Sequence, residues 1–222
     1  MNIFTPSKKQ LKTKTSFDGA FFDRDYFENG RESGKGWYVN YCWMPRRSIR
    51  EALAFIDYMG LDEKSYVLDF GCAKGFIVKA LRMLEIKADG CDISEYALSF
   101  APIGCWNSGN GHDARGKYTH VICKDVLEHL TPEHLGTVLE WIKTVAPKFM
   151  CVVPIGDNGK YRIPEYEVEV SHLIAEDEEW WMDKFKQHGW KIVKHVNHVK
   201  GLKDNWYEIA PYGNYVFYLE AE

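Results

Sequence analysis

A nine-residue stretch, VLDFGCAKG at positions 67–75, restricts the possible folds of this chain more than any other feature. The apolar run before Gly71 predicts a buried strand, and positions 76–86 predict a helix whose apolar side chains share one face. A strand, a tight glycine-bounded turn and a helix form the nucleotide-binding corner of open α/β sheets. The sequence therefore predicts a doubly wound, mostly parallel α/β sheet with a ligand site at this turn.

The glycine spacing of this turn argues against a bound diphosphate. A dinucleotide fingerprint reads G-x-G-x-x-G, whereas this chain places Gly71, Ala73 and Phe76 at the three glycine positions. The phosphate-cradling G-x-x-x-x-G-K-[ST] pattern is also absent from the sequence. Asp69 precedes the turn, and its carboxylate would repel a pyrophosphate but attract a cation. We therefore expect a cationic ligand that approaches the backbone closely at the glycines.

Two motifs together resemble those of one enzyme family. DFGCAKG at 69–75 looks like motif I of the class I S-adenosylmethionine-dependent methyltransferases, and KDVLEHL at 124–130 looks like the motif after their fourth strand, in the small-molecule branch. The resemblance is close over about 67–153 and loose elsewhere. It implies a Rossmann-like seven-stranded sheet whose last strand is antiparallel. It also implies S-adenosylmethionine as methyl donor, S-adenosylhomocysteine as product, and cofactor contacts by Asp69, Gly71, Cys72, Ala73 and Gly75.

Three further segments are expected to contact the cofactor. Asp92 lies 23 positions after Asp69, where an acidic residue accepts from ribose hydroxyls, and a helix-capping or turn aspartate is the alternative. We expect Ile93 against the adenine. By resemblance, Asp113 would accept from the adenine amino group and the Ala114 backbone would contact the ring. The alternative for Asp113 is again a turn aspartate.

The segment after the fourth predicted strand supplies candidates for the methionine end of the cofactor. Ligands of parallel sheets sit at the carboxyl ends of the strands, so Lys124 and Asp125 should face that end. Glu128 and His129 form either a catalytic pair or a structural pair that orients the loop. We take Asp125 and His129 as catalytic candidates.

A polar segment at about 156–175 is expected to be the acceptor loop, because insertions after the fifth strand shape the acceptor pocket in the resembled family. His172 is the candidate general base, since histidine titrates near neutral pH. The alternative is a histidine that holds the loop together.

An unusually aromatic segment at 17–44 precedes the predicted sheet. It shows no single helical or strand period, so we expect a cap that packs on the domain, a lid over the ligand, or both. Tyr26 and Tyr38 are the candidates whose rings would contact the sulfonium through cation–π interactions. Before the cap, Lys8, Lys9 and Lys12 belong to a frayed tail or, alternatively, to a nucleic-acid-binding arm.

Composition and charge limit which partners and which cellular compartment we expect for this protein. The formal net charge of -4 gives no general attraction to nucleic acid or an anionic membrane. No apolar run approaches the ~20 residues that span a bilayer, and the N-terminus lacks the apolar segment of a secretory signal. The six cysteines contain no C-x-x-C pair, so we expect reduced packing thiols and no bound metal. The expectation is a cytoplasmic protein without nucleic-acid or membrane partners.

The sequence thus predicts a single domain over 1–222, with tail and cap at 1–60 and the α/β core at 61–222. A helix at 46–59 should bury Ile49, Leu53, Ile56 and Met59, and strands at 190–199 and 214–220 should follow one another without a helix. The expected activity is methyl transfer to an oxygen or nitrogen of a small molecule or glycan. The alternatives are a non-catalytic S-adenosylmethionine-binding scaffold and an NAD-dependent oxidoreductase.

Overall fold

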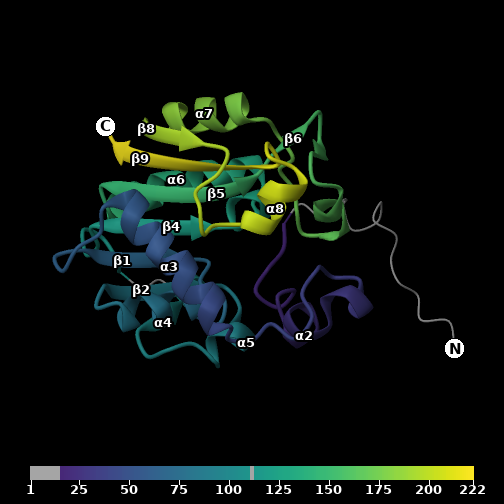
Figure 1. Cartoon of the computed structure of the whole chain (residues 1–222), viewed down its shortest axis with the longest axis horizontal. Helices are drawn as coiled ribbons and strands as arrows, with labels where there is room; N and C mark the ends of the chain where they lie inside the picture. Colours follow the sequence, from purple (N-terminus) through teal and green to yellow (C-terminus); the bar gives the residue numbers. More distant parts are fainter. Residues whose placement is uncertain (1–15, 111–112) are drawn as a thin grey trace, which may run out of the picture.

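The computed structural model of the chain describes residues 16–110 and 113–222. Its main sheet has seven strands in the order β3-β2-β1-β4-β5-β9-β8 (Figure 1). The five neighbouring strands β3, β2, β1, β4 and β5 pair in parallel, and β9 pairs antiparallel with both β5 and β8. The predicted doubly wound, mostly parallel sheet is confirmed. The strands are β1 (Tyr66–Phe70), β2 (Lys87–Asp92), β3 (Cys105–Asn107), β4 (His120–Lys124), β5 (Lys148–Pro154), β8 (Trp190–Val196) and β9 (Asn214–Ala221), with a separate hairpin of β6 (Gly156–Asp157) and β7 (Lys160–Tyr161).

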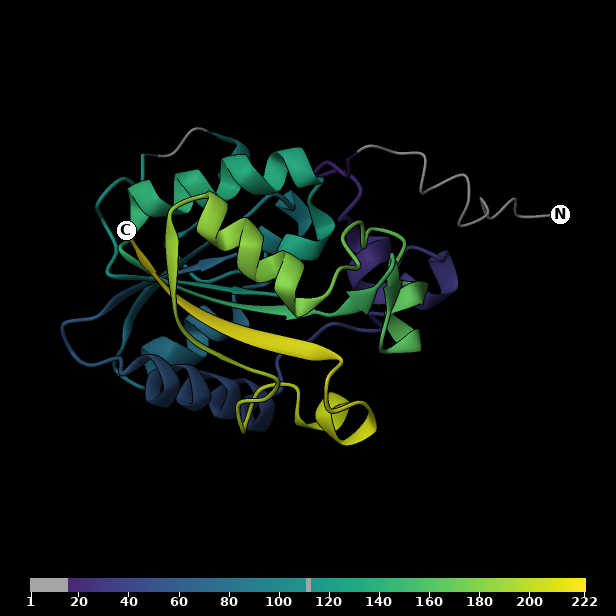
Figure 2. The same ribbon diagram turned by 90° about the horizontal axis from the view of Figure 1, so that it is seen from above.

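Helices cover both faces of this sheet, as Figure 2 shows: α3 and α4 lie on one side and α6 and α7 on the other. Each face has its own apolar core, one built with α6 and α7 and the other with α3 and α4. The helices are α2 (Arg24–Ser33), α3 (Pro45–Met59), α4 (Phe76–Met83), α5 (Glu95–Leu98), α6 (Pro132–Val145), α7 (Glu178–Gln187) and α8 (Asp204–Ile209), with 3₁₀ turns η1 (Ser108–Asn110), η2 (Leu127–His129) and η3 (Pro164–Val168).

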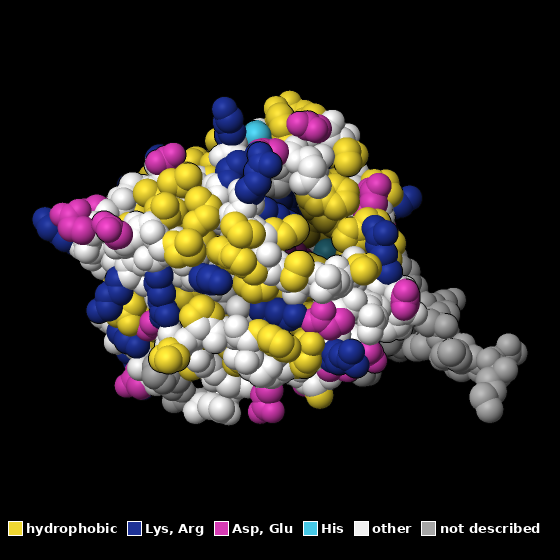
Figure 3. All heavy atoms as spheres, turned by 60° about the horizontal axis from the view of Figure 1, so that its bottom comes forward, with side chains coloured by type: hydrophobic (Ala, Val, Ile, Leu, Met, Phe, Trp, Pro, Cys, Tyr) yellow, Lys and Arg dark blue, Asp and Glu magenta, His cyan; other side chains and the backbone are white. Residues whose placement is uncertain are grey.

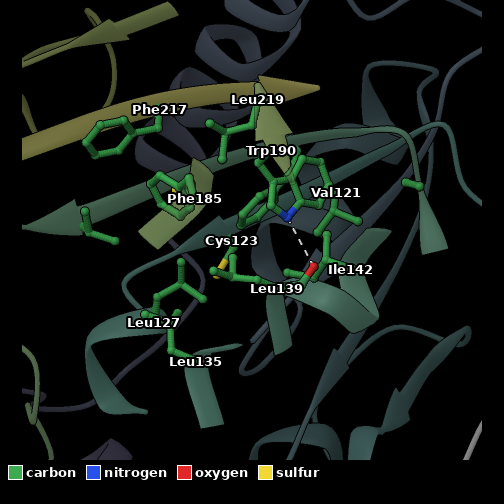
Figure 4. Close-up of a cluster of buried hydrophobic side chains, with 14 of the residues drawn as sticks. Val121, Cys123, Leu127, Leu135, Leu139, Ile142, Phe185, Trp190, Phe217 and Leu219 are labelled. Atoms are coloured by element: carbon green, nitrogen blue, oxygen red, sulfur yellow. Dashed lines mark hydrogen bonds between the residues drawn. The ribbon is translucent and has the colours of Figure 1, made fainter. Parts of the chain in front are cut away.

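The core beneath α6 and α7 fixes the position of β4 and of the turn that follows it. Phe185, Trp190 and Leu139 are fully buried there, and the Trp190 indole N–H donates to the Leu139 carbonyl oxygen at 3.2 Å (Figure 4). Burying each such side chain contributes about 1.5–3 kcal/mol. Leu127, in η2, is also fully buried in this core. The turn that carries the predicted catalytic residues is thus held by apolar packing.

Helix α3 buries only part of the predicted stripe. Met59 is buried, and Ile49 and Ile56 pack partly buried against the core, but Leu53 is 43% exposed. The buried face also includes Ser48, Ala52 and Phe55. The prediction followed the most apolar side chains. The buried face instead begins with polar residues because the first turns of α3 line a cavity rather than the apolar core.

The expectation that no helix separates the last two strands is wrong, since α8 lies between β8 and β9. Its Trp206 contacts distant segments, with ring centroids 5.3 Å from Tyr166 and 6.5 Å from Trp37. A six-residue helix held by such tertiary contacts carries no periodic signal in the sequence.

The aromatic segment folds as a cap beside the carboxyl end of β4 (Figure 1). Its helix α2 begins at Asp23, whose side chain accepts from the Tyr26 N–H at 3.1 Å, and ends at the left-handed Gly34. Tyr26 and Phe27 pack with α5. None of the described helices is both long and apolar enough to cross a membrane. The lysine-rich segment at 1–15 lies outside the described residues.

Candidate functional site

A cavity of about 210 Å³ lies between the cap and the carboxyl ends of β1, β2 and β4. The cap contributes aromatic side chains, α3 contributes polar ones, and the strand ends contribute carboxylates and a lysine. Figure 3 shows one face of the molecule that is hollowed, with hydrophobic side chains around the hollow and a histidine within it. Of the residues expected to bind the cofactor, the lining includes Tyr26, Tyr38, Asp69, Gly71, Cys72, Ala73, Asp92, Ile93, Lys124 and Asp125.

The glycines of the first turn are required by its geometry. Gly71 has φ +78°, and a Cβ there would fall 2.2 Å from Cγ2 of Val126. Gly75 has φ +68°, and its Cβ would fall 2.5 Å from Cδ of Pro102. Gly75 does not line the cavity, so its role in this structure is to let the turn enter α4.

The backbone donors of this turn are bonded within the protein. The N–H groups of Gly71 and Cys72 donate to the Cys91 carbonyl oxygen at 2.8 and 3.0 Å. The Ala73 N–H donates to Oδ2 of Asp92 at 2.8 Å, and the Gly75 N–H donates to the Cys72 carbonyl oxygen at 2.8 Å. A phosphate-binding loop needs such N–H groups to point at the ligand. This turn therefore lets a ligand approach the backbone closely, but its N–H groups do not point at the ligand to bind an anion.

Asp69 is a buried carboxylate at the end of β1, with 5% of its surface exposed. Burial, and next the charge of Asp92, raise its pKa to about 7, while Lys124 acts in the opposite direction. Among residues 16–110 and 113–222, no side chain or N–H group donates a hydrogen bond to its carboxylate. A cationic group of a ligand beside Asp69 would supply the missing partner.

Asp92, at the end of β2, holds the turns around it through hydrogen bonds, as the alternative to a ribose-binding role predicts. Its two oxygens accept from the N–H groups of Ala73 and Ser94, both at 2.8 Å. Burial raises the pKa of this carboxyl, and the bonds from Ser94 and Ala73 lower it. Each carboxylate oxygen keeps a second lone pair for a ligand hydroxyl. The neighbouring Ile93 is 39% exposed and lines the cavity.

Two other residues predicted to contact the adenine, Asp113 and Ala114, are not in the cavity wall. Asp113 has an exposed side chain that accepts from Nε of Arg115 at 3.2 Å, and Ala114 is buried in the apolar core. Neither residue lines the cavity, whereas Ser108 in η1 does. Ser108 follows β3 directly. The rule that strand carboxyl ends line the ligand site could therefore have identified it from the sequence. The neighbouring His112 lies outside the described residues.

Lys124 and Asp125 form a buried ion-pair network at the carboxyl end of β4. The Lys124 ammonium donates to Oδ2 of Asp125 at 2.8 Å, and Lys203 pairs with Oδ1. Lys203 also donates to Tyr166 and Asn214 at 2.9 and 2.8 Å. Although burial opposes ionisation, the two lysines hold the pKa of Asp125 well below its usual range. Asp125 is therefore a fixed anion at neutral pH, and Lys203 is a member of the site that sequence reasoning missed.

His129 lines the cavity, and His172 lies directly behind it with their ring centroids 4.8 Å apart. Burial lowers the pKa of His129 to about 4 and holds that of His172 well below its usual value. Both imidazoles are neutral at pH 7 for this reason. Glu128 is fully buried beside them, and burial raises its pKa to about 8. The structure thus brings together Glu128, His129 and His172 but leaves His172 out of the cavity lining.

The cap is tied to the first turn by Lys74, whose side chain is almost fully buried. Its ammonium pairs with Glu28 of α2 and donates to the Tyr41 carbonyl oxygen at 2.8 Å. The Tyr96 hydroxyl donates to the same Glu28 carboxylate at 3.0 Å. Lys74, within the first motif, therefore anchors the cap to the turn. The start of α3 adds three lining residues that sequence reasoning missed, Arg47, Ser48 and Glu51.

No protein-family model and no curated protein match this sequence. Solved structures do match its fold. Magnesium protoporphyrin IX methyltransferase from Synechocystis PCC 6803, with bound S-adenosylhomocysteine, has a TM-score of 0.60 and 16% identity, covering 92% of this chain and 98% of that one. A Haloferax volcanii complex between the Trm112 methyltransferase activator and a methyltransferase candidate gives a TM-score of 0.63 at 15% identity, covering 80% and 91%.

A third similar structure is the Burkholderia thailandensis 1,6-didemethyltoxoflavin N1-methyltransferase, with a TM-score of 0.57 and 15% identity, covering 78% of each chain. It contains 1,6-didemethyltoxoflavin and S-adenosylhomocysteine. The structural neighbours are class I S-adenosylmethionine-dependent methyltransferases, and the fold of this chain is theirs. At these identities the comparison establishes the fold alone.

Proposed function

We propose that this single-domain protein is a methyltransferase that moves a methyl group from S-adenosylmethionine to an oxygen or nitrogen of a small molecule or glycan and releases S-adenosylhomocysteine. The observation that carries the proposal is Asp69. It is a buried carboxylate at the end of β1 without a hydrogen-bond donor among the described residues, and it faces a cavity walled by aromatic rings. The cofactor brings an ammonium and a sulfonium, and either cation would stabilise the ionised carboxylate.

The turn after β1 supports this ligand over NAD. The N–H groups of Gly71, Cys72 and Ala73 already donate to protein acceptors, so a diphosphate would find few donors there. Asp69 and Asp92 together would repel it. An adenosine with a cationic tail needs only the close approach that Gly71 allows and the free lone pairs of Asp92.

The aromatic cap provides rings that could contact the methyl-donor end of the cofactor. Tyr26 is buried and Tyr38 is partly buried in the cavity wall, with ring centroids 5.6 Å apart. An aromatic face near a desolvated cation contributes about 2 kcal/mol. Methyl transfer is an in-line displacement at carbon, so alignment of donor and acceptor by such walls supplies much of the catalysis.

The acceptor is proposed as a small molecule or glycan because the cavity is only about 210 Å³ and the aromatic cap forms one of its walls. Two of the structural neighbours are named for small molecules, magnesium protoporphyrin IX and 1,6-didemethyltoxoflavin. Asp125 and His129 line the cavity and can contact a bound acceptor, whereas His172 lies behind His129 and does not line it.

Two assays test the proposal. A thermal-shift comparison should show stabilisation by S-adenosylhomocysteine and none by NAD, and stabilisation by NAD alone would overturn it. Incubation with labelled S-adenosylmethionine and a panel of hydroxylated and aminated acceptors, followed by mass spectrometry, should then reveal a methylated product. Cofactor binding without transfer to any acceptor would favour the alternative, a non-catalytic cofactor-binding scaffold.

A further inference from the structure

Three side chains that can bind a metal converge behind the inner end of the cavity. Glu128 and His129 come from η2, and His172 comes from the loop that covers it. One ligand atom from each lies within 4.8 Å of those from the other two. The closest measured approach is 3.8 Å, between Oε1 of Glu128 and Nε2 of His172.

The Glu128 carboxylate lacks the partners that a buried acid needs. The residue is fully buried, and neither of its side-chain oxygens has a hydrogen-bond partner in the described part of the chain. The backbone carbonyl of Glu128 accepts from the N–H groups of Leu173 and Ile174, at 2.7 and 3.1 Å. These bonds hold the covering loop against η2. A buried polar group without partners is costly, so a ligand that satisfies these oxygens would be strongly stabilised.

The ring of His129 is oriented by a chain of hydrogen bonds. Its Nδ1 lies 2.8 Å from Oγ of Ser171, and that hydroxyl donates to Oε1 of Glu169 at 2.9 Å. Because the single hydroxyl proton goes to Glu169, Nδ1 of His129 must be the protonated nitrogen that donates to Ser171. This tautomer leaves the lone pair on Nε2. Metal-binding histidines are commonly fixed in this way by a polar group behind the ring.

We propose that Glu128, His129 and His172 bind a divalent first-row transition-metal cation at the inner end of the cofactor cavity. Two imidazoles and one carboxylate suit zinc, manganese, iron or cobalt, whereas magnesium prefers an all-oxygen shell. Ligand atoms around zinc lie about 2.0–2.2 Å from the metal, so the three side chains must close in by about 1 Å. The proposal departs from the expectation of no metal, which rested only on cysteine and histidine spacing in the sequence.

The charges around the cluster allow a cation there. Two nearby lysines, Lys203 and Lys124, are paired with Asp125, and Glu169 adds an acidic group behind His129. His129 also lines the cavity, which gives the metal contact with a bound molecule.

The next step rests on the proposed function. A cation at this place implies an acceptor whose hydroxyl group contacts the cation. A metal lowers the pKa of such a hydroxyl. Its proton leaves to solvent, its oxygen bonds to the methyl carbon, and the carbon–sulfur electron pair returns to sulfur to give neutral S-adenosylhomocysteine.

The test is titration of the metal-free full chain with Co²⁺, read by its visible absorption, and with Zn²⁺ and Mg²⁺ by calorimetry. All variants carry Cys42→Ser, because that exposed thiol lines the same cavity. Glu128→Gln and His172→Ala are compared with the matched controls Glu140→Gln and His188→Ala, a surface pair at 3.2 Å. S-adenosylhomocysteine binding is measured on each variant as a check of folding.

We expect one Co²⁺ per chain, affinity reduced about tenfold or more in the two site variants, and no change in the controls. Absence of Co²⁺ and Zn²⁺ binding, or equal affinity in site and control variants, overturns the metal site. Should the site variants fail to fold, X-ray absorption of the zinc-loaded parent decides: a nitrogen and oxygen shell supports the site and sulfur ligation overturns it. Metal binding without S-adenosylhomocysteine binding would instead count against the proposed function and leave the metal site standing.

Discussion

Cofactor affinity should fall as the pH is lowered through the titration of Asp69. Burial and the charge of Asp92 raise the pKa of Asp69 to about 7 in the empty site, and a cationic ligand binds the ionised form. About half of the carboxyls are ionised at pH 7 and about 1% at pH 5. The affinity for S-adenosylmethionine should therefore weaken about 50-fold between these values, which equals about 2.3 kcal/mol at 25 °C.

The sign of this effect is fixed by linkage. Because the pKa is raised in the empty site and lowered by the bound cation, binding releases protons and is favoured at higher pH. Titration calorimetry at pH 7, 6 and 5 measures the slope directly. Asp69→Asn should bind weakly and with a flat dependence over this range. Asp113→Asn, which changes an exposed aspartate outside the cavity, should keep the slope of the parent.

Melting temperatures at each pH separate this effect from unfolding. The reasoning is refuted if the parent shows no loss of affinity between pH 7 and pH 5. It is also refuted if Asp69→Asn keeps the full slope, since other buried acids would then carry it.

Three further substitutions test the site. Gly71→Ala should abolish S-adenosylhomocysteine binding in calorimetry, because the added Cβ would fall 2.2 Å from Val126. The control is Gly60→Ala, which has the same left-handed backbone but nothing within 4 Å of the added Cβ, and it should cost only about 1 kcal/mol of stability. Equal binding by the two variants would contradict this prediction. The Trp37 N–H of the cap donates to Oε2 of Glu169 at 3.1 Å. Gly36→Ala places a Cβ 2.3 Å from that oxygen, so this bond should break and hydrogen exchange of the cap should rise. Unchanged exchange would show that the bond does not hold the cap. His172→Ala should lower turnover with nearly unchanged affinity for S-adenosylhomocysteine, and unaffected turnover would remove this residue from the mechanism.

The parts of the site that depend on local chain geometry were predictable from sequence. The strand, turn and helix around Gly71 follow from a run of apolar residues and two glycines. Asp69 and Lys124 follow from the rule that strand ends line the ligand site. Such features need only a few neighbouring residues to fix them, and the structure places each of these residues in the cavity wall.

The parts that depend on distant contacts were not predictable. Lys203 reaches Asp125 from the segment between β8 and β9, and Ser171 orients His129 from the covering loop. Neither pairing leaves a periodic or spacing signal in the chain. The predicted stripe of α3 was wrong at Leu53 and left out Ser48, which is buried where the first turns of the helix line the cavity.

The most direct measurement is titration calorimetry of the full chain with S-adenosylhomocysteine, S-adenosylmethionine and NAD at pH 7.5. The account predicts one site for each of the two sulfur-containing nucleosides and no heat with NAD. Absence of heat with both nucleosides, or binding of NAD alone, would contradict the assignment of this cavity.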